Sequence, residues 1–518
     1  MRDEQRVLGG GIYVTGGWAP QQFSVGLNGL DVGEDCNILH KYIDAKVASL
    51  ANGKDSSCQQ DGSPQGCKRR RYSGPDLPED IRRHIRFLMP LQDAARAACV
   101  SRAFLSSWRC RPDITISWKT LGLDKNFHGK DEIAKDFNSI VDQILKNRSG
   151  IGLKTLKIDF CDYKADTYSY LNNWLEIAIT PELEELTLDL FSRKAKYSFP
   201  CSLLSNGRGN SIQHLKLVWC AFSTTVRLDC LKNLTSLHLR DVHITGNELG
   251  CLFSSSSALE RLELHGCHRI VCLEIPCLLQ RLRYLRVFAC ERLKVIESKA
   301  PNISSFHLSE FQGKFSLGES SLQLKDMMLS MNCTISFARA KLPSIVPNLK
   351  SLSLASDYEV PNTPLVSKTF LHLKYLSITL SEGAFSPYYD CFSVVSFLDV
   401  APSLETLLLG VTQLRMKHEP FVGEPSPQNQ IMGTRHSNLK SVKISGFCSA
   451  KSLVELTCYI LECSDHEISK CPPLTKNIIR DSQNALLVIR AWIEGKVPPS
   501  VKFNVLAPCS KCHNADED

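Results

Sequence analysis

A short apolar phrase recurs along most of this 518-residue chain and constrains its fold more than any other feature. In each copy, apolar side chains stand at positions 1, 4 and 6, and successive copies begin 21 to 35 residues apart. Side chains two apart in a strand point to the same face, so positions 4 and 6 can be buried together. A lone copy has nothing to cover its three apolar side chains, whereas stacked copies cover one another. The twelve copies begin at Leu153, Leu183, Ile212, Leu234, Leu259, Leu282, Ile303, Leu324, Leu349, Leu373, Leu404 and Leu439.

The spacing of these copies predicts the fold class. Leucine-rich repeats are about 20 to 29 residues long, and most of the spacings fall in that range. Cys220, Cys267 and Cys290 each come three residues after the last apolar position of a copy. This repeat type places asparagine or cysteine there, in the turn that leaves the strand. The sequence therefore predicts an α/β leucine-rich-repeat solenoid over residues 151–445, with parallel strands on its concave face.

Positions 2, 3 and 5 of each copy are expected to line the concave face. They mix acidic, basic, hydroxyl and aromatic side chains, among them Arg261, Glu263, Tyr284 and Arg286. No stripe of one charge sign suits a phosphate backbone, and a net charge of +7 over the whole chain is a weak field. We therefore expect a protein as partner of this face and no nucleic acid, with a small-molecule pocket in the concave face as an alternative.

Neither a catalytic nor a cofactor site is predicted. The chain has no G-x-S-x-G turn and no H-E-x-x-H pair. Cys267 and His268 with Cys272 and Cys277 lack the paired close spacing of zinc ligands, and the repeat turn already accounts for Cys267. No metal is predicted, but one closely spaced set near the end leaves a zinc clip as an open alternative. Its ligands would be Cys509, Cys512 and His513.

Residues 1–72 differ in composition from the rest of the chain. They hold eleven of the 29 glycines and show neither strand alternation nor a helical period, so we expect a disordered arm. Four consecutive cations at its end suit either a nuclear import signal or a solvated linker: Lys68, Arg69, Arg70 and Arg71. The sequence shows no secretory signal and no run of about 18 apolar residues, so we expect no membrane partner and a location in the nucleus, the cytoplasm or both.

Residues 73–112 predict three short helices. Asp76 can cap the first helix, with Glu79 reaching back to it, and Ser101 can cap the third. Three apolar side chains share one face of the first helix: Ile81, Ile85 and Leu88. Some forty residues in three helices cannot bury much of their own surface, so an apolar docking face is expected to remain.

The same segment resembles an F-box. Leu-Pro is followed by two acidic residues and isoleucine, then by a second isoleucine four residues later and by the run Val100-Ser101-Arg102. The resemblance implies binding to a Skp1-like adaptor and, through it, to a cullin. Many F-boxes have tryptophan where Phe104 stands, whereas Trp108 lies a turn later here. Carried over by position, the residues that would make or support the adaptor contact are Leu77, Pro78, Ile81, Ile85, Leu91, Val100 and Phe104.

The repeat pattern ends before residues 446–518. Helices are predicted over 452–461 and 481–494, followed by a strand over 501–505, and such elements cap the end of a solenoid. The F-box, the irregular repeats and the Lys-Val-Pro-Pro and Pro-Cys-Ser-Lys-Cys-His ending together resemble plant F-box/leucine-rich-repeat proteins with an FBD-like tail.

These observations predict five segments: a 1–72 arm, a 73–112 F-box, a 113–150 helical linker and N-terminal cap, the 151–445 solenoid and a 446–518 cap. The resemblance implies a substrate-recognition subunit of an SCF-type ubiquitin ligase that is not itself an enzyme. It would bind an unknown target protein through the repeats. The alternatives are a protein-interaction scaffold outside any ligase and a small-molecule receptor.

Overall fold

The computed structural model divides the chain into two units, Met1–Gly74 and Pro75–Asp518, and all described residues lie in the second. The structure describes residues 78–123, 130–148, 152–161, 167–191, 197–205, 207–223, 231–356, 359, 369–380, 391–411, 436, 438–446, 451–463 and 486–493. Several residues singled out above lie outside this set: Lys68, Arg69, Arg70, Arg71, Leu77, Cys509, Cys512 and His513. The predictions made for them therefore stay predictions.

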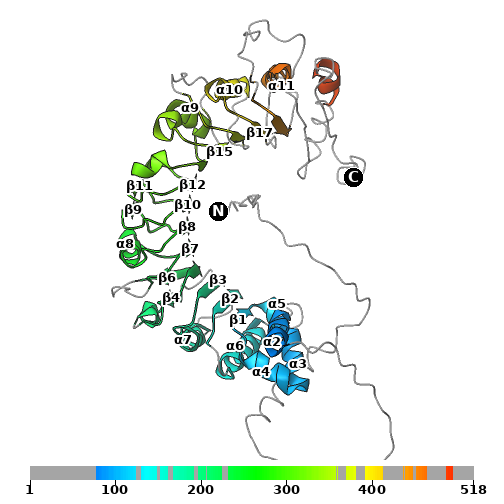
Figure 1. Cartoon of the computed structure of the whole chain (residues 1–518), viewed down its shortest axis with the longest axis vertical. Helices are drawn as coiled ribbons and strands as arrows, with labels where there is room; N and C mark the ends of the chain where they lie inside the picture. Colours follow the sequence, from blue (N-terminus) through cyan, green and yellow to red (C-terminus); the bar gives the residue numbers. More distant parts are fainter. Residues whose placement is uncertain are drawn as a thin grey trace, which may run out of the picture. The chain divides into compact units, whose positions relative to one another are not determined.

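The second unit is built on one 13-stranded sheet, whose strands follow one another in chain order and pair in parallel. Figure 1 shows these strands stacked side by side along the inner edge of a curve, with α8 and α9 on the outer side. The strands are β1 (Asp113–Ile116), β2 (Thr155–Cys161), β3 (Glu185–Phe191), β5 (His214–Val218), β7 (Ser236–Arg240), β8 (Arg261–His265), β10 (Tyr284–Phe288), β12 (Ser305–Ser309), β14 (Asp326–Ser330), β15 (Ser351–Ser356), β16 (Tyr375–Leu380), β17 (Thr406–Val411) and β18 (Ser441–Ser445).

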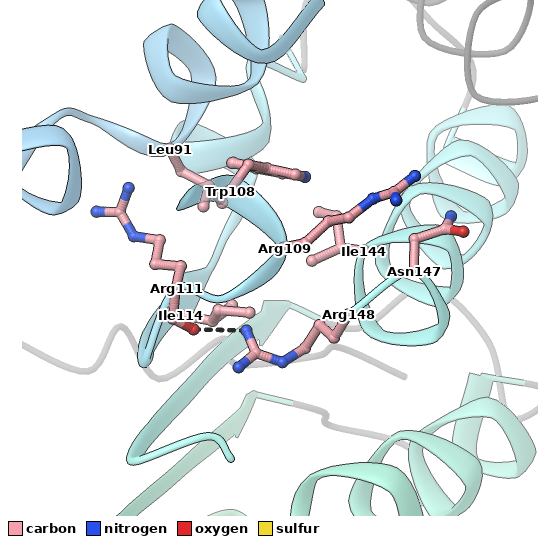
Figure 2. Close-up of a pocket in the computed structure, with 8 residues that line it drawn as sticks. All are labelled: Leu91, Trp108, Arg109, Arg111, Ile114, Ile144, Asn147 and Arg148. Atoms are coloured by element: carbon pink, nitrogen blue, oxygen red, sulfur yellow. Dashed lines mark hydrogen bonds between the residues drawn. The ribbon is translucent and has the colours of Figure 1, made fainter. Parts of the chain in front are cut away.

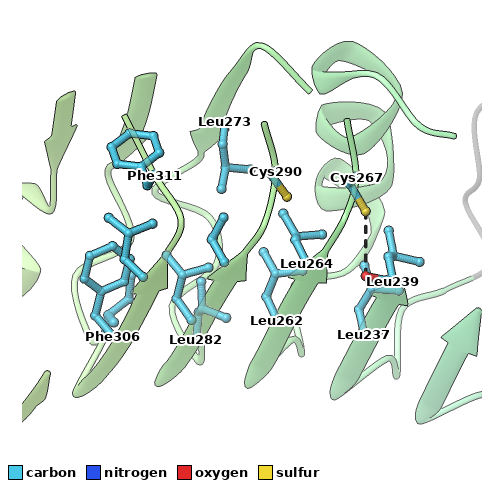
Figure 3. Close-up of a cluster of buried hydrophobic side chains, with 14 of the residues drawn as sticks. Leu237, Leu239, Leu262, Leu264, Cys267, Leu273, Leu282, Cys290, Phe306 and Phe311 are labelled. Atoms are coloured by element: carbon cyan, nitrogen blue, oxygen red, sulfur yellow. Dashed lines mark hydrogen bonds between the residues drawn. The ribbon is translucent and has the colours of Figure 1, made fainter. Parts of the chain in front are cut away.

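The buried residues confirm the repeat prediction. All three apolar positions of all twelve copies are buried, and most have no exposed surface. In Figure 3 the leucines of adjacent strands, such as Leu237 and Leu262, lie side by side in one row along the sheet. Since burying one such side chain stabilises a fold by about 1.5 to 3 kcal/mol, the continuous stack supplies most of the driving force for folding. The α/β fold class is thus as predicted.

The sheet begins earlier than predicted. Residues 113–150 were expected to form a helical linker, but β1 already pairs with β2, and its residues Ile114 and Ile116 fill positions 4 and 6 of a thirteenth copy. The copy is hidden in the sequence because position 1 is Arg111 instead of an apolar residue. Helices α5 (Trp118–Leu121) and α6 (Lys130–Lys146) then follow.

The turn after several of the strands follows a rule that the sequence pattern does not reveal. Position 8 has a positive φ in several copies, and most of these residues are not glycine. They are Trp219, Asp241, Gly266, Ala289, Glu310 and Gly446. The next residue, at position 9, turns back into the core, where Cys220, Cys267 and Cys290 are buried as predicted for turn residues. Val242 and Phe311 fill the same position in other copies.

The outer side of the repeats is irregular, which explains their unequal lengths. Three short strands form a second parallel sheet, two others pair separately, and helices replace strands elsewhere. The strands are β9 (Cys272–Ile275), β11 (Val295–Ser298), β13 (Lys314–Ser316), β4 (Tyr197–Phe199) and β6 (Cys220–Phe222). The helices are α7 (Thr167–Ala178), η1 (Cys201–Leu204), α8 (Gly246–Ser255), η2 (Gly318–Leu322), α9 (Thr334–Ile345), η3 (Cys391–Val394) and α10 (Val395–Val400).

Helix α9 begins against a buried carboxylate. Glu359 is 2% exposed and accepts hydrogen bonds from the backbone N–H groups of Ile335 at 2.6 Å and Ser336 at 3.2 Å. The hydroxyls of Ser336 and Ser356 each donate to it at 2.7 Å. A carboxylate there satisfies donors that the first turn of a helix leaves unpaired and complements the helix dipole.

Replacing Glu359 by alanine is therefore expected to lower the free energy of unfolding by about 2 kcal/mol, because the buried N–H groups lose a charged acceptor. Urea denaturation followed by circular dichroism would measure this change. Glu319→Ala is the matched control, since Glu319 is exposed, and it should change stability by no more than about 0.5 kcal/mol. Equal stability of the two variants would contradict the assigned role of Glu359.

The C-terminal part contains the helix predicted over 452–461, which is α11 (Lys451–Cys463). Of the helix predicted over 481–494, the structure describes residues 486–493, and their last turn is a π-helix, η5 (Ile489–Ile493). The strand predicted over 501–505 lies outside the described residues. Within the part of the chain that the structure describes, no helix combines the length and apolarity needed to cross a bilayer.

Candidate functional site

Three helices precede the sheet: α2 (Glu79–Leu88), α3 (Leu91–Val100) and α4 (Arg102–Arg109). Pro78 and Pro90 stand immediately before α2 and α3, where proline is well tolerated. Ser101 precedes α4 as predicted, but its side chain makes no capping hydrogen bond. Asp76, the other predicted cap, lies outside the described residues, and the residue at the start of α2 is Pro78.

These helices keep an apolar surface exposed, as their size predicts. Ile81 is 44% exposed and Ile85 is 49% exposed, on one face of α2, while Leu88 reaches 72% and Val100 at the end of α3 reaches 84%. We call these four residues the exposed helical face. Pro78 is also exposed, and Phe104 is half-buried beneath Arg86, whose guanidinium carbon lies 5.8 Å from the ring centroid. Side chains with this much uncovered apolar surface on neighbouring short helices are typical of a protein contact.

Leu91 differs from the other residues of the predicted adaptor-binding set. It is 9% exposed and belongs to the same core cluster as Ile114 of β1. It therefore holds α3 against the sheet and is placed to support a contact on the helices and not to make one. Trp108, near the end of α4, also packs against that core.

Two arginines join the helices to the first strand. Arg111 donates from one guanidinium nitrogen to the backbone carbonyls of Phe87 at 2.7 Å and Met89 at 2.9 Å, and from Nε to that of Asp113 at 3.1 Å. Its own carbonyl accepts a hydrogen bond of 2.6 Å from Arg148. Figure 2 shows the two side chains beside the hollow between α4 and α6. Burial lowers the pKa of both guanidinium groups, but they stay charged at neutral pH.

A second candidate surface is the solvent-facing side of the 13-stranded sheet, which we call the concave face. Because side chains alternate along a strand, positions 3, 5 and 7 point outward when positions 4 and 6 are buried. Positions 2, 3 and 5 were predicted to face outward, but position 2 precedes the strands, and position 7 was omitted. The strands extend to position 7 in the middle of the sheet, which adds Arg240, His265 and Phe288 to this face.

Arg261 lies at the centre of a first polar network on the concave face. Its Nε donates to a Glu263 carboxylate oxygen at 2.6 Å, and its guanidinium carbon lies 3.9 Å from the ring centroid of Tyr284. His238 approaches the other carboxylate oxygen of Glu263 at 3.3 Å. Burial opposes ionisation of Glu263, but the hydrogen bonds from His238 and Arg261 lower its pKa to about 2. Glu263 is therefore ionised and already engaged at neutral pH.

A second network lies on the next strands. The Tyr284 hydroxyl is 3.2 Å from Nδ1 of His307, and Nε2 of His307 is 2.8 Å from a carboxylate oxygen of Asp326. Ser305 donates to the same carboxylate oxygen at 2.8 Å and is 3.2 Å from the same His307 nitrogen. Burial opposes ionisation of Asp326, but hydrogen bonds from His307 and Ser305 outweigh it and lower the pKa of the carboxyl.

This second network contains serine, histidine and aspartate but differs from a serine hydrolase triad. In a triad the serine and the carboxylate contact opposite nitrogens of the imidazole ring, so that the ring can take the serine proton while the carboxylate orients it. Here both contact Nε2 of His307, and Nδ1 faces Tyr284. The arrangement orders the polar face without activating Ser305 as a nucleophile.

The cysteine and histidine residues considered as metal ligands are dispersed. The Cys267 thiol is buried and lies 3.6 Å from the Leu239 carbonyl oxygen, whereas Cys277 and His268 are exposed. Across the residues that the structure describes, no group of three or more cysteine, histidine or acidic side chains is placed to hold a metal ion. The predicted alternative at Cys509, Cys512 and His513 falls outside them.

Comparison with known proteins now places the fold in a family. Residues 144–510 match the family model described as At1g61320/AtMIF1, LRR domain, which covers more than half of the chain. The chain belongs to this leucine-rich-repeat family. The identification agrees with the resemblance found in the sequence and with the parallel sheet of the solenoid.

This leucine-rich-repeat protein is also similar to three curated proteins of Arabidopsis thaliana. It is 23% identical over 367 residues to the putative FBD-associated F-box protein At5g56560, a match that covers 68% of this chain and 79% of the relative. It is 25% identical over 233 residues to the putative F-box/FBD/LRR-repeat protein At4g03220, covering 43% of this chain and 44% of the relative. It is 24% identical over 167 residues to the F-box/LRR-repeat protein At3g26922, covering 32% of this chain and 50% of the relative.

Sequence reasoning missed two features of these surfaces. Arg111 was passed over because a charged residue at position 1 breaks the apolar phrase, although its place just before a strand with isoleucine at positions 4 and 6 could have identified the hidden copy. The pairings across the concave face were missed because cross-strand partners lie some 20 to 30 residues apart in the sequence, as with His307 and Asp326.

Proposed function

We propose that this protein is a substrate-recognition subunit of an SCF-type ubiquitin ligase. In this role α2–α4 bind a Skp1-like adaptor and, through it, a cullin, while the solenoid holds a target protein. Ubiquitin transfer is carried out by other subunits. The segment boundaries predicted from the sequence, 73–112 for docking, 151–445 for target binding and 446–518 for capping, form part of this proposal.

The observation that carries the proposal is the exposed helical face. Four large apolar side chains on these short helices are exposed: Ile81, Ile85, Leu88 and Val100. An apolar surface of this kind is typical of a site that a partner protein covers. Relatives named as F-box proteins support the choice of a Skp1-like adaptor as the partner that covers it. Leu77, Pro78 and Phe104 complete the proposed contact, and Leu91 supports it from the core.

Replacing both Ile81 and Ile85 by alanine should weaken binding of a Skp1-like adaptor by roughly ten- to a hundredfold, because each exposed isoleucine would lose its buried contact in the complex. The full chain would be captured on purified adaptor, and its dissociation constant would be measured by biolayer interferometry. The folded structure should be unaffected, since both side chains are already about half exposed in the free protein.

The matched control is a double substitution of two other exposed leucines, Leu322→Ala with Leu371→Ala, which are 58% and 60% exposed and lie on the solenoid. This variant should bind the adaptor as the unaltered chain does. Equal affinity of the two double variants, or failure of the unaltered chain to bind any Skp1-like adaptor, would contradict the proposal. The second outcome would favour an interaction scaffold outside the ligase.

A further inference from the structure

We propose that the middle of the concave face binds an acidic segment of a partner protein, through a patch formed by Arg240, His265, Arg286 and Phe288. We call these four residues the central patch. The inference rests on the proposed function, since it names the chemistry of the target that the solenoid would hold. Three observations support it: the pairing register of β7, β8 and β10, the ion-pair partners of the nearby carboxylates, and the cations around His265.

The four residues are neighbours on one surface. Arg240, His265 and Phe288 occupy position 7 of β7, β8 and β10, where they are direct partners in the parallel pairing. Arg286 precedes Phe288 by two residues on β10, so its side chain points to the same face. The His265 ring meets the Phe288 ring edge to face, with centroids 4.5 Å apart. The patch therefore combines two guanidinium groups with an aromatic shelf.

Of the carboxylates near the patch, Asp241 lies 3.6 Å from Nε of Arg240, whereas two others have partners outside the patch. Glu263, which is in register with Arg286, accepts from Arg261 at 2.6 Å and lies 3.3 Å from His238. Asp326 is held by His307 at 2.8 Å. The Arg286 guanidinium forms no hydrogen bond or ion pair with any residue that the structure describes. A half-buried guanidinium without an anion can accept a carboxylate from outside, and its planar fork binds such a group with two parallel hydrogen bonds.

Near the two ends of the sheet, several lysines are paired with carboxylates. Glu405 lies between Lys374 at 2.7 Å and Lys440 at 2.8 Å, and these contacts lower its pKa to about 2. Near the other end, Lys154 pairs with Glu184 at 2.8 Å. These lysines and glutamates neutralise one another, whereas the Arg286 guanidinium has no carboxylate partner among the described residues.

The electrostatic environment of His265 supports the same conclusion. Burial is the largest cause that lowers its pKa to about 4, and the next causes are the nearby cations Arg240 and Arg286, followed by His238 and His268. These cations add to burial in opposing protonation of His265. At neutral pH the ring is uncharged and offers, with Phe288, an apolar contact beside the guanidinium groups. A partner segment that alternates aspartate or glutamate with apolar residues fits both properties.

The test is a selection from a random peptide display library on the immobilised full chain. If the chain binds a Skp1-like adaptor, the selection is done on the complex. Peptides selected by the unaltered chain should be enriched in aspartate and glutamate beside an apolar residue. Arg286→Glu and Arg286→Gln should abolish this enrichment, and a selected peptide should bind Arg286→Glu at least tenfold more weakly. Its affinity for the unaltered chain should also fall as salt is raised, because the attraction between exposed charges is screened.

Arg269→Glu makes the same charge change in an exposed turn outside the concave face and should leave peptide selection unchanged. If the folded, unaltered chain selects no acidic peptides, or if Arg286→Glu selects them equally well, the inference is wrong. Adaptor binding is measured in parallel and separates this result from the proposed function. Arg286→Glu should retain the adaptor, whereas Ile81→Ala with Ile85→Ala should lose it and still select acidic peptides.

Discussion

Replacing Phe306 by alanine is expected to lower the free energy of unfolding by about 3 to 5 kcal/mol, the largest stability change that we predict for a single substitution. Phe306 occupies position 4 of β12 and has no exposed surface. Its ring centroid lies 5.5 Å from that of Phe315 on the outer strand β13, which in turn lies 5.9 Å from that of Phe337 in α9. Removing the ring leaves a cavity between the sheet and its outer layer that rigid neighbouring repeats cannot close.

The measurement is urea denaturation of the full chain, followed by circular dichroism. Met328→Ala is the matched control, because Met328 lies on the adjacent strand β14, is 38% exposed and points to the concave face. Truncating it should change stability by no more than about 0.5 kcal/mol. A loss of similar size in both variants would mean that Phe306 is not a core position and would remove the basis of the stacking argument.

The effect should also spread along the stack. In repeat proteins each unit is stabilised mainly by its neighbours, so weakening one interface exposes the units on both sides. Hydrogen exchange in Phe306→Ala should therefore accelerate in β10 and β14 together with β12. Strands far along the sheet, such as β2 and β17, should be less affected.

The sequence predicted the repeated layer well because the layer follows a strict local rule. Every strand must supply apolar side chains at positions 4 and 6, and a buried leucine is as visible in the sequence as in the fold. The same holds for the exposed helical face, whose isoleucines recur at helical spacing on a segment too small to cover them. In both places the local spacing of apolar residues was a sufficient guide.

The parts that were missed follow rules that are not local. The turn residue at position 8 has a positive φ, yet it is tryptophan, aspartate or alanine in different copies. Backbone hydrogen bonds that recur from repeat to repeat impose this conformation, so glycine is not required. One such bond runs from the N–H of Asp241 to the His265 carbonyl of the next repeat at 2.7 Å. Similarly, the availability of Arg286 depends on which partners Glu263 takes, and no sequence window contains all of these strands.

Replacing Arg111 by alanine is the second change for which we expect a large effect, and it concerns the link between the two proposed binding surfaces. Its guanidinium donates to the carbonyls of Phe87 and Met89, which lie at the junction of α2 and α3. Hydrogen bonds from a charged donor contribute about 1.5 to 3 kcal/mol each, and the two carbonyls would lose their partner together. We therefore expect the free energy of local opening of α2 and α3 to fall by about 3 kcal/mol.

Native-state hydrogen exchange measures this quantity directly. Amides in α2 and α3 should exchange faster in Arg111→Ala, whereas amides of β7 to β12 should keep their protection. Arg109→Ala is the matched control, because Arg109 lines the same hollow but has no hydrogen-bond or ion-pair partner among the described residues. Arg111→Lys should be intermediate, since lysine keeps the charge but has no second nitrogen to donate to the Asp113 carbonyl as Nε of Arg111 does. Unchanged exchange in all three variants would show that Leu91 and the other apolar contacts hold the helices by themselves.

Adaptor binding should follow the same order, for a reason that does not involve contact. Arg111 donates to the helix junction from the sheet side and belongs to the joint and not to the exposed helical face. If α2 and α3 open more often, part of the binding free energy is used to close them. The apparent affinity for the adaptor is then the intrinsic affinity multiplied by the fraction of molecules in which the helices are closed. Arg111→Ala should therefore weaken adaptor binding only once the open form becomes the major one, whereas Ile81→Ala with Ile85→Ala weakens it at every temperature. A temperature series of adaptor affinities distinguishes the two mechanisms: the isoleucine variant should show a constant offset from the unaltered chain, and the arginine variant an offset that grows on warming.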